Sequence, residues 1–103
     1  MIIRIVKLTL RTEEVDTFLK LFAAAKQTIR STEGCEHLEL LRDNSNPNIF
    51  FTHSHWQNTE ALDNYRNSDF FRKTWSETKA LFQEKAAAWS LEKFVNLPES
   101  TLD

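Results

Sequence analysis

The stretch that decides the fold is residues 34–56, GCEHLELLRDNSNPNIFFTHSHW. Its two strand-like runs, residues 35–42 and 49–56, flank DNSNPN, an unbroken series of turn-forming residues. This arrangement predicts an antiparallel β-hairpin. Side chains alternate between the two faces of a strand, so His53 and His55 share one face while Trp56 lies on the other.

The pairing register of this hairpin decides which side chains meet. If Leu41 faces Ile49, then His37 faces His53 on the same side as Glu39. A shift by one residue would move His37 to the opposite face. In the first register Cys35 faces His55, and the polar residues that gather on one face are His37, Glu39, His53 and His55.

Three histidines and a carboxylate on one face raise the question of a metal site. A two-histidine, one-carboxylate iron site needs ligand atoms within about 2.0–2.2 Å of one ion, and adjacent strands of a flat sheet rarely provide this convergence. We therefore expect no metal and no cofactor. We interpret His53 and His55 as polar contacts on a surface that faces a second subunit, where their protonation makes assembly mildly pH-sensitive.

The N-terminal part of the chain predicts a strand and then a helix. Residues 2–10, IIRIVKLTL, are apolar on both faces, and the charges within this run argue against a signal peptide or a membrane span. Thr12 is a candidate helix N-cap and Gly34 a candidate stop. The apolar stripe of the predicted helix consists of Val15, Phe18, Leu19, Phe22 and Ile29.

The C-terminal part predicts two helices and a last strand. Asn58 begins a short helix over TEALDNYR, and Ser68 begins a longer one over residues 70–87. The EKAAA segment within this range is a good helix former. The final strand is AWSLEKFV, residues 88–95. The apolar stripe of the longer helix consists of Phe71, Trp75, Thr78 and Phe82.

The order of these elements, β-α-β-β-α-α-β, predicts an α+β fold: a ferredoxin-like four-stranded antiparallel sheet with helices on one face. The domain covers residues 1–95, and residues 96–103 form a polar C-terminal tail. The other face of the sheet would expose an apolar patch, which favours a homodimer formed sheet against sheet. The residues of this patch include Ile3, Ile5, Ile49 and Phe51.

Composition excludes several functional classes. A net charge of −2 without a basic stripe argues against a nucleic-acid partner. Gly34 is the only glycine, whereas phosphate-binding loops and dinucleotide fingerprints need several. The lone Cys35 excludes an internal disulfide and zinc motifs built on paired cysteines, and it suggests a cytoplasmic protein.

The segment GCEHLELLRDNSNPNIFFTHSHW, followed by TEALDNYRNSDFF, resembles the antibiotic biosynthesis monooxygenase family of dimeric α+β barrels. The resemblance extends over residues 2–95. Its landmarks are Gly34, Cys35, Asp43, Pro47, Trp56, Leu62, Ser68 and Phe71. It implies oxygenation without a bound cofactor, because a deprotonated phenol or quinol can itself reduce O₂ once a protein positions it.

The chain departs from the family pattern at acid–base positions. Ser54 stands where many members carry glutamate, and Tyr65 and Phe70 stand where many carry histidine. Haem-degrading members carry an axial histidine at the position of Trp75, so haem breakdown by that route is not expected here.

The resemblance and the residue pattern together suggest a site. Tyr65 would handle a proton or stabilise an oxyanion, with Trp56 on the opposite wall. The predicted substrate-binding residues are Thr52, Ser54, Phe71 and Trp75. The alternatives are that Tyr65 is a core-edge tyrosine with its hydroxyl in water and that Trp75 belongs to the helix core.

Two functions follow from this pattern. The first is a cofactor-independent monooxygenase acting on a small aromatic, quinol- or phenol-like substrate. The second is a non-catalytic dimeric module of the same fold, either ligand-binding or stress-associated. An open apolar cavity with a polar wall would favour the enzyme, whereas a space filled by side chains would favour the second function.

Overall fold

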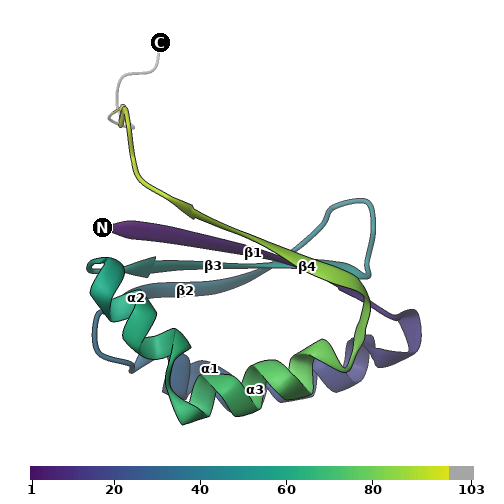
Figure 1. Cartoon of the computed structure of the whole chain (residues 1–103). Coiled ribbons are helices and arrows are strands. Elements are labelled where there is room, and N and C mark those ends of the chain that lie inside the picture. Colours follow the sequence, from purple (N-terminus) through teal and green to yellow (C-terminus); the bar gives the residue numbers. More distant parts are fainter. Residues whose placement is uncertain (98–103) are drawn as a thin grey trace.

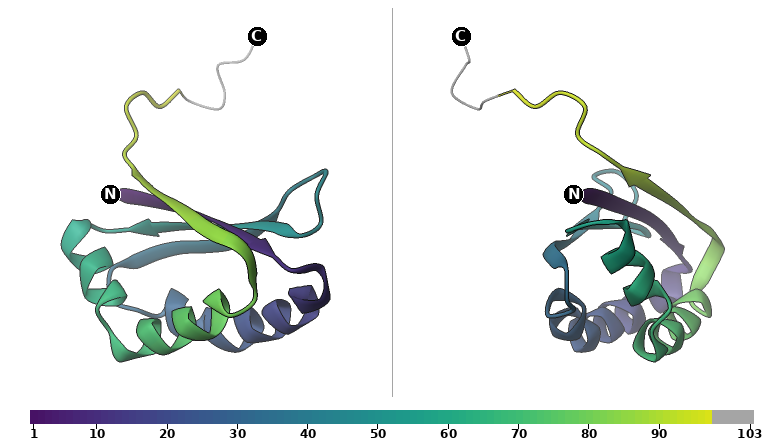
Figure 2. Two further views of the ribbon diagram at one scale, coloured as in Figure 1. Left: turned by 45° about the vertical axis from the view of Figure 1, so that its right-hand side comes forward. Right: turned by 60° about the vertical axis from the view of Figure 1, so that its left-hand side comes forward.

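One antiparallel sheet and one layer of helices form the described part of the chain, residues 1–97, in this computed structural model (Figure 1). The sheet has four strands in the order β2-β3-β1-β4, and the helices cover one of its faces (Figure 2). This confirms the ferredoxin-like fold. The elements are β1 (Ile2–Leu10), the 3₁₀ turn η1 (Thr12–Glu14), α1 (Val15–Arg30), β2 (Cys35–Arg42), β3 (Ile49–Trp56), α2 (Thr59–Arg66), α3 (Asp69–Lys79) and β4 (Phe82–Leu91).

The hairpin of β2 and β3 has the predicted strand limits but a different register. Leu41 pairs with Phe51 and not with Ile49, because the loop closes with the Asp43 N–H donating to the Ile49 carbonyl at 2.8 Å. The Asp43 carboxylate also accepts from two backbone N–H groups of the loop, which fixes this closure. The register differs by two residues, an even number, so the side chains from His37 onward keep their predicted faces.

A bulge near the start of β2 changes one predicted contact. The register shifts between Cys35 and His37, so Cys35 pairs with Trp56 and does not face His55. Cys35 is buried as a free thiol. His37 pairs instead with His55.

The start of the first helix differs from the prediction. Thr12 is not an N-cap but lies in η1, and its Oγ1 accepts a hydrogen bond from Asn48 Nδ2 at 2.7 Å. The α1 helix begins at Val15 without a side-chain cap. In the predicted stripe Phe18 and Ile29 are buried, but Leu19 is exposed. The extra turn of 3₁₀ geometry and the packing on the sheet, rather than a cap, set where α1 begins.

The largest difference lies between α3 and β4. The predicted helix over residues 70–87 ends at Lys79, and β4 begins at Phe82 rather than at residue 88. Lys7 pairs with Ala87 across β1 and β4, so the EKAAA segment is strand despite its helical propensity. Ladder hydrogen bonds and burial against the central strand outweigh a preference of a few tenths of a kcal/mol per residue, about the size of most propensity differences.

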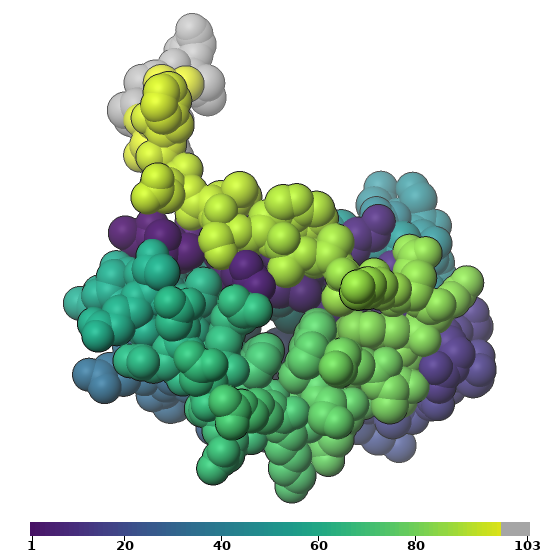
Figure 3. Space-filling model, viewed as in Figure 1, coloured from purple at the N-terminus to yellow at the C-terminus, as the bar shows by residue number. Residues whose placement is uncertain are grey.

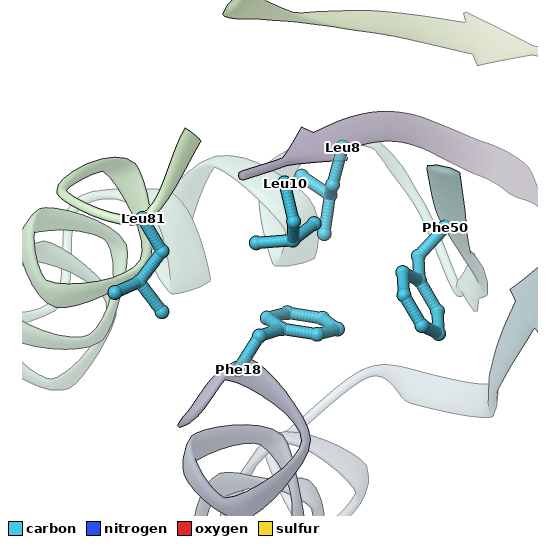
Figure 4. Close-up of a cluster of buried hydrophobic side chains, with 5 residues drawn as sticks. All are labelled: Leu8, Leu10, Phe18, Phe50 and Leu81. Carbon is cyan, nitrogen blue, oxygen red and sulfur yellow. The ribbon is translucent and has the colours of Figure 1, made fainter. Parts of the chain in front are cut away.

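The core lies between the helices and the inner face of the sheet. One buried cluster joins β1, β3 and α1, with Phe18 beneath the strands and its ring centroid 5.2 Å from that of Phe50 (Figure 4). A second cluster, at the other end of the hairpin, consists of Cys35, Trp56 and Leu62. The first cluster consists of Leu8, Leu10, Phe18, Phe50 and Leu81. Each fully buried Leu or Phe side chain contributes about 1.5–3 kcal/mol.

The outer face of the sheet carries no helix from the described residues (Figures 1 and 2). Trp89 and Leu91 of β4 are 46% and 47% exposed, and Leu41 of β2 is 44% exposed. After β4 the chain leaves the body of the molecule, and Phe94 is 99% exposed (Figure 2). The predicted tail falls partly outside the described residues, which end at residue 97.

None of the helices within residues 1–97 combines the length and the apolar character that crossing a bilayer requires.

Candidate functional site

A cavity of about 380 Å³ lies between the sheet and the helices. Figure 3 shows a hollow on this side of the molecule, between α2 and α3 below and β4 above. Its volume falls within the range of about 300–1,000 Å³ typical of small-molecule sites. The cavity brings together all the residues predicted for the site, which are Thr52, Ser54, Trp56, Tyr65, Phe71 and Trp75. The space behind Trp56 is therefore open and not filled by side chains.

Trp56 and Tyr65 form one end of the cavity. Trp56 is 1% exposed, and its indole N–H donates to Ser54 Oγ at 3.0 Å. The rings of Trp56 and Tyr65 stack with their centroids 4.9 Å apart and an interplanar angle of 23°. Strand parity makes this contact possible, because Ser54 and Trp56 both point from β3 toward the helices. The indole N–H of Trp56 is thus already used within the protein, and the ring serves as a wall.

Aromatic rings continue this wall along the helices. Tyr65 contacts Phe71 edge to face at 5.1 Å, and Phe71 stacks on Trp75 at 5.9 Å. Trp75 in turn meets Phe82, the first residue of β4, at 5.6 Å. A continuous row of this kind presents flat apolar surfaces on which a planar ring can pack.

Tyr65 has an altered acidity. Burial, with a smaller effect of Cys35, raises the pKa of Tyr65 to about 12. The phenol therefore stays protonated at neutral pH and can donate a hydrogen bond but not act as a base. Burial also raises the pKa of Cys35, so the thiol stays neutral and unsuited to nucleophilic attack.

The cavity wall contains two arginines that the prediction missed. Arg4 lies on β1 and Arg66 at the end of α2, and both line the cavity. Sequence reasoning treated Arg4 only as an interruption of an apolar run. The alternation of side chains along β1 could have revealed this position. Arg4 points to the same face of the strand as Val6 and Leu8, which also line the cavity.

No carboxylate or imidazole lines this cavity among the described residues. Ser54 occupies the position where the family often has glutamate, and its hydroxyl accepts from the indole. Phe70, at a position where many members carry histidine, lines a separate surface depression and not the cavity. The site therefore offers hydrogen-bond donors and positive charge but no conventional general base.

The predicted histidine cluster exists, on the opposite face of the sheet. Glu39 Oε1 lies 2.6 Å from His53 Nδ1 and 3.2 Å from His37 Nε2, and His53 Nε2 lies 3.0 Å from His55 Nε2. Hydrogen bonds from His53 and then His37 lower the pKa of Glu39. Burial and then the charges of His37 and His53 lower the pKa of His55.

These side chains are also the residues that could hold a metal. The ligand atoms of His37, Glu39 and His53 lie within 4.8 Å of one another. The same atoms already satisfy one another through the hydrogen bonds to Glu39, and all three side chains are at least partly exposed. The geometry is thus explained by a polar network without an ion.

Fold and cavity together define the class of protein: a ferredoxin-like α+β domain with a cavity lined by aromatic residues between sheet and helices. Residues 1–76 match the antibiotic biosynthesis monooxygenase family. The chain belongs to this family.

Solved structures share the fold over nearly the whole length. A conserved protein from Methanosarcina mazei Go1 is 22% identical, with a TM-score of 0.85 over 90% of this chain and 93% of that chain. A structure described as an antibiotic biosynthesis monooxygenase is 19% identical, with a TM-score of 0.86 over 92% and 100%. Rv0793 from Mycobacterium tuberculosis is 16% identical, with a TM-score of 0.84 over 94% and 98%. At such identities the likeness concerns the fold alone. No curated protein shows a significant match.

Proposed function

We propose that the protein is a cofactor-independent monooxygenase that oxidises a small aromatic phenol or quinol with O₂. The observation that carries the proposal is the open cavity lined by the half-buried Tyr65 and a row of aromatic rings. In this reaction the ionised substrate reduces O₂. One oxygen atom enters the ring at a C–H position as a carbonyl, and the other leaves as water.

Each predicted residue has a role in this proposal. Tyr65 stays protonated and donates a hydrogen bond to the developing oxyanion, which stabilises negative charge in a low-dielectric site. Trp56 holds the Tyr65 ring by stacking. Phe71 and Trp75 orient the substrate ring, and Thr52 and Ser54 form the polar part of the wall.

We also infer that the protein is a homodimer joined through the outer face of the sheet. Trp89, Leu91 and Leu41 are each more than two-fifths exposed there, and a monomer rarely leaves such a patch in water. Phe94 and Val95 project beyond β4 with 99% and 71% exposure, as expected of an arm that packs on a second copy. The free thiol of Cys35 suits the reducing cytoplasm, where we place the protein.

Oxygen consumption tests the catalytic proposal. With a panel of hydroquinones and monophenols, uptake should exceed the protein-free blank, and Tyr65→Phe should lower kcat by about 100-fold, as loss of one oxyanion donor does elsewhere. The variant keeps the ring that stacks on Trp56, so its thermal midpoint should stay close to that of the parent. Uptake equal to the blank for every substrate, or full activity in Tyr65→Phe, would refute the assignment.

One observation favours a second function, a non-catalytic small-ligand-binding module. The described cavity wall lacks a general base, and Ser54 stands at a position that is often acidic in the family. Quenching of tryptophan fluorescence separates the two functions, because Trp56 and Trp75 line the cavity. Saturable quenching by phenols without any oxygen uptake would support the binding module.

A further inference from the structure

Arg4 occupies a position where a charge is unexpected. The inner side of β1 is otherwise apolar near it, with Val6 on the cavity wall and Leu8 only 2% exposed. The strand is central, since β3 and β4 pair with it on either side. Arg4 itself is half-buried and its hydrogen bond to Ser90 is exposed, so its guanidinium still reaches solvent. A charged side chain in an otherwise apolar wall adds little to packing and is available to a ligand.

The polar partner that Arg4 does have is neutral. Its Nη1 donates to Ser90 Oγ on β4 at 2.9 Å, and across β3 it pairs with Ser54. This hydrogen bond fixes the guanidinium at the cavity wall but leaves its charge uncompensated. Arg4 has several N–H donors, so others remain available to a ligand.

Arg66 adds a second positive charge to the same cavity. It is the last residue of α2, where the helix dipole favours a cation. Burial and then the charge of Arg66 lower the pKa of Arg4, so the two groups repel each other. Among residues 1–97 neither forms an ion pair, and the acidic side chains that do so pair with Arg11, His37 and His53.

Two unpaired guanidinium groups beside an apolar cavity are complementary to an anion. Arg66 is exposed and Arg4 is half-buried, so their repulsion is partly screened by solvent. An anion between them would still turn this repulsion into attraction. The guanidinium fork matches the two oxygens of a carboxylate better than a lysine ammonium would. The aromatic wall beyond them fits the ring to which such a group is attached.

We propose that Arg4 and Arg66 form a carboxylate subsite and that the ligand is therefore an aromatic acid, such as a hydroxylated benzoate, and not a neutral quinol. The inference deepens the proposed function and rests on it for the reaction, whereas the binding itself requires no turnover. The subsite also explains how the substrate can ionise although the described part of the cavity wall has no general base. Two positive charges near the ring stabilise a phenolate, so the substrate ionises more readily in the cavity than in water.

Binding of a matched ligand pair tests the subsite. Benzoate and benzamide have almost the same shape and differ in charge, and both can be titrated by calorimetry or tryptophan fluorescence. We expect benzoate to bind at least 10-fold more tightly to the full chain, with an advantage that shrinks at high salt. Arg4→Met and Arg66→Gln should each weaken benzoate binding by about 10-fold or more and leave benzamide binding unchanged.

Arg72→Gln provides the matched control, because Arg72 is exposed on α3 and does not line the cavity. It removes the same charge from the surface and should leave both affinities unchanged. If Arg4→Met does not fold, Arg66→Gln still tests the loss of charge. Arg4→Lys then tests the guanidinium fork, because it keeps the charge and should weaken benzoate binding less than the loss of charge does. Equal binding of benzoate and benzamide by the parent, or an equal loss of both in the arginine variants, would overturn the subsite.

Turnover separates this inference from the proposed function. Oxygen uptake with hydroquinone but no preference for 2,5-dihydroxybenzoate would refute the carboxylate subsite and leave the monooxygenase standing. Charge-selective binding with no oxygen uptake from any dihydroxybenzoate or quinol would refute the monooxygenase and retain the subsite.

Discussion

Single residues decide the site more than any element does. Trp56 and Tyr65 were predicted on opposite walls of a space beneath the helices. Both line one cavity, but their rings stack on each other at one end of it. Arg4 and Arg66 were missed because each reads as an ordinary surface charge until the strand parity and the helix position are combined. What the residues do in the cavity stays a proposal, tested by Tyr65→Phe and by the arginine variants.

Gly34 is the residue whose identity the backbone constrains most. Its φ of 88° lies in the left-handed region, and an added Cβ would overlap the Cβ of Ala61. Its carbonyl accepts a hydrogen bond from the Gln57 N–H at 2.8 Å, which ties the start of β2 to the end of β3. The glycine was predicted as the helix stop, but α1 ends at Arg30 with Ser31 as its C-cap. Gly34 instead lies in the turn before β2, where its lack of a side chain admits α2 close to the chain.

We predict that Gly34→Ala lowers the free energy of unfolding by about 1–3 kcal/mol through backbone strain alone, with a further cost from the clash. Urea denaturation of the two proteins measures the difference. Ala61→Gly is the matched partner, because it removes the Cβ that the new methyl group would meet. In a double-mutant cycle the two changes should couple favourably, and strictly additive effects would contradict the proposed contact.

At the scale of elements, the starts of α2 and α3 were predicted correctly, whereas the start of α1 and the end of α3 were not. Asn58 Oδ1 accepts from the Ala61 N–H at 2.8 Å, and Ser68 Oγ accepts from the Phe71 N–H at 3.1 Å. Both caps were predicted because a short polar side chain before a helical run leaves a local signal. The local signal for the end of α3 is weaker, because the residues after Lys79 are good helix formers. They pair with β1 only in the folded chain.

Ser68 should matter more than a simple cap. Its hydroxyl also donates to the Tyr65 carbonyl at 2.6 Å, so it joins the end of α2 to the start of α3. We predict that Ser68→Ala lowers the free energy of unfolding by about 1–2 kcal/mol, and Asn58→Ala by about 1 kcal/mol or less. Chemical denaturation measures both. A smaller loss in Ser68→Ala than in Asn58→Ala would show that the link between the two helices contributes nothing.

At the scale of the whole molecule, the outer sheet face combines an apolar patch with the histidine cluster. His55 has a lowered pKa, so it is held neutral in the folded protein, whereas an unfolded or more exposed imidazole binds a proton more readily. Its stabilising contribution is present above the ordinary histidine pKa of 6.5 and is lost as the pH falls below that value. The lowered pKa of Glu39 acts at lower pH, because its contribution is lost only below its ordinary value of 4.5. The charged or titratable groups that act on His55 are His37, His53, Lys93 and Glu39, and its partner on β1 is the apolar Ile3.

We predict that the homodimer weakens as the pH falls from about 7.5 to about 5.5, because protonation of His55 places a positive charge on a face that a second copy would cover. Sedimentation velocity or light scattering after size exclusion should show the dissociation constant rising by about 10-fold. His55→Gln removes the titrating group and should flatten this dependence. A monomer at every pH would refute the sheet-face dimer, and a pH-independent dimer would refute the role of His55.

The sequence by itself determined the hairpin strands, both C-terminal helix starts, the ferredoxin-like topology and the face on which each β3 side chain lies. These features depend on local signals, namely turn residues, caps and a period of two, which act between neighbours in the chain. Only the tertiary structure decided the hairpin register, the length of β4 and the meeting of Arg4 with Arg66 at one cavity. Those features depend on which distant segments pair and on how much volume remains between sheet and helices. No local sequence pattern encodes either property.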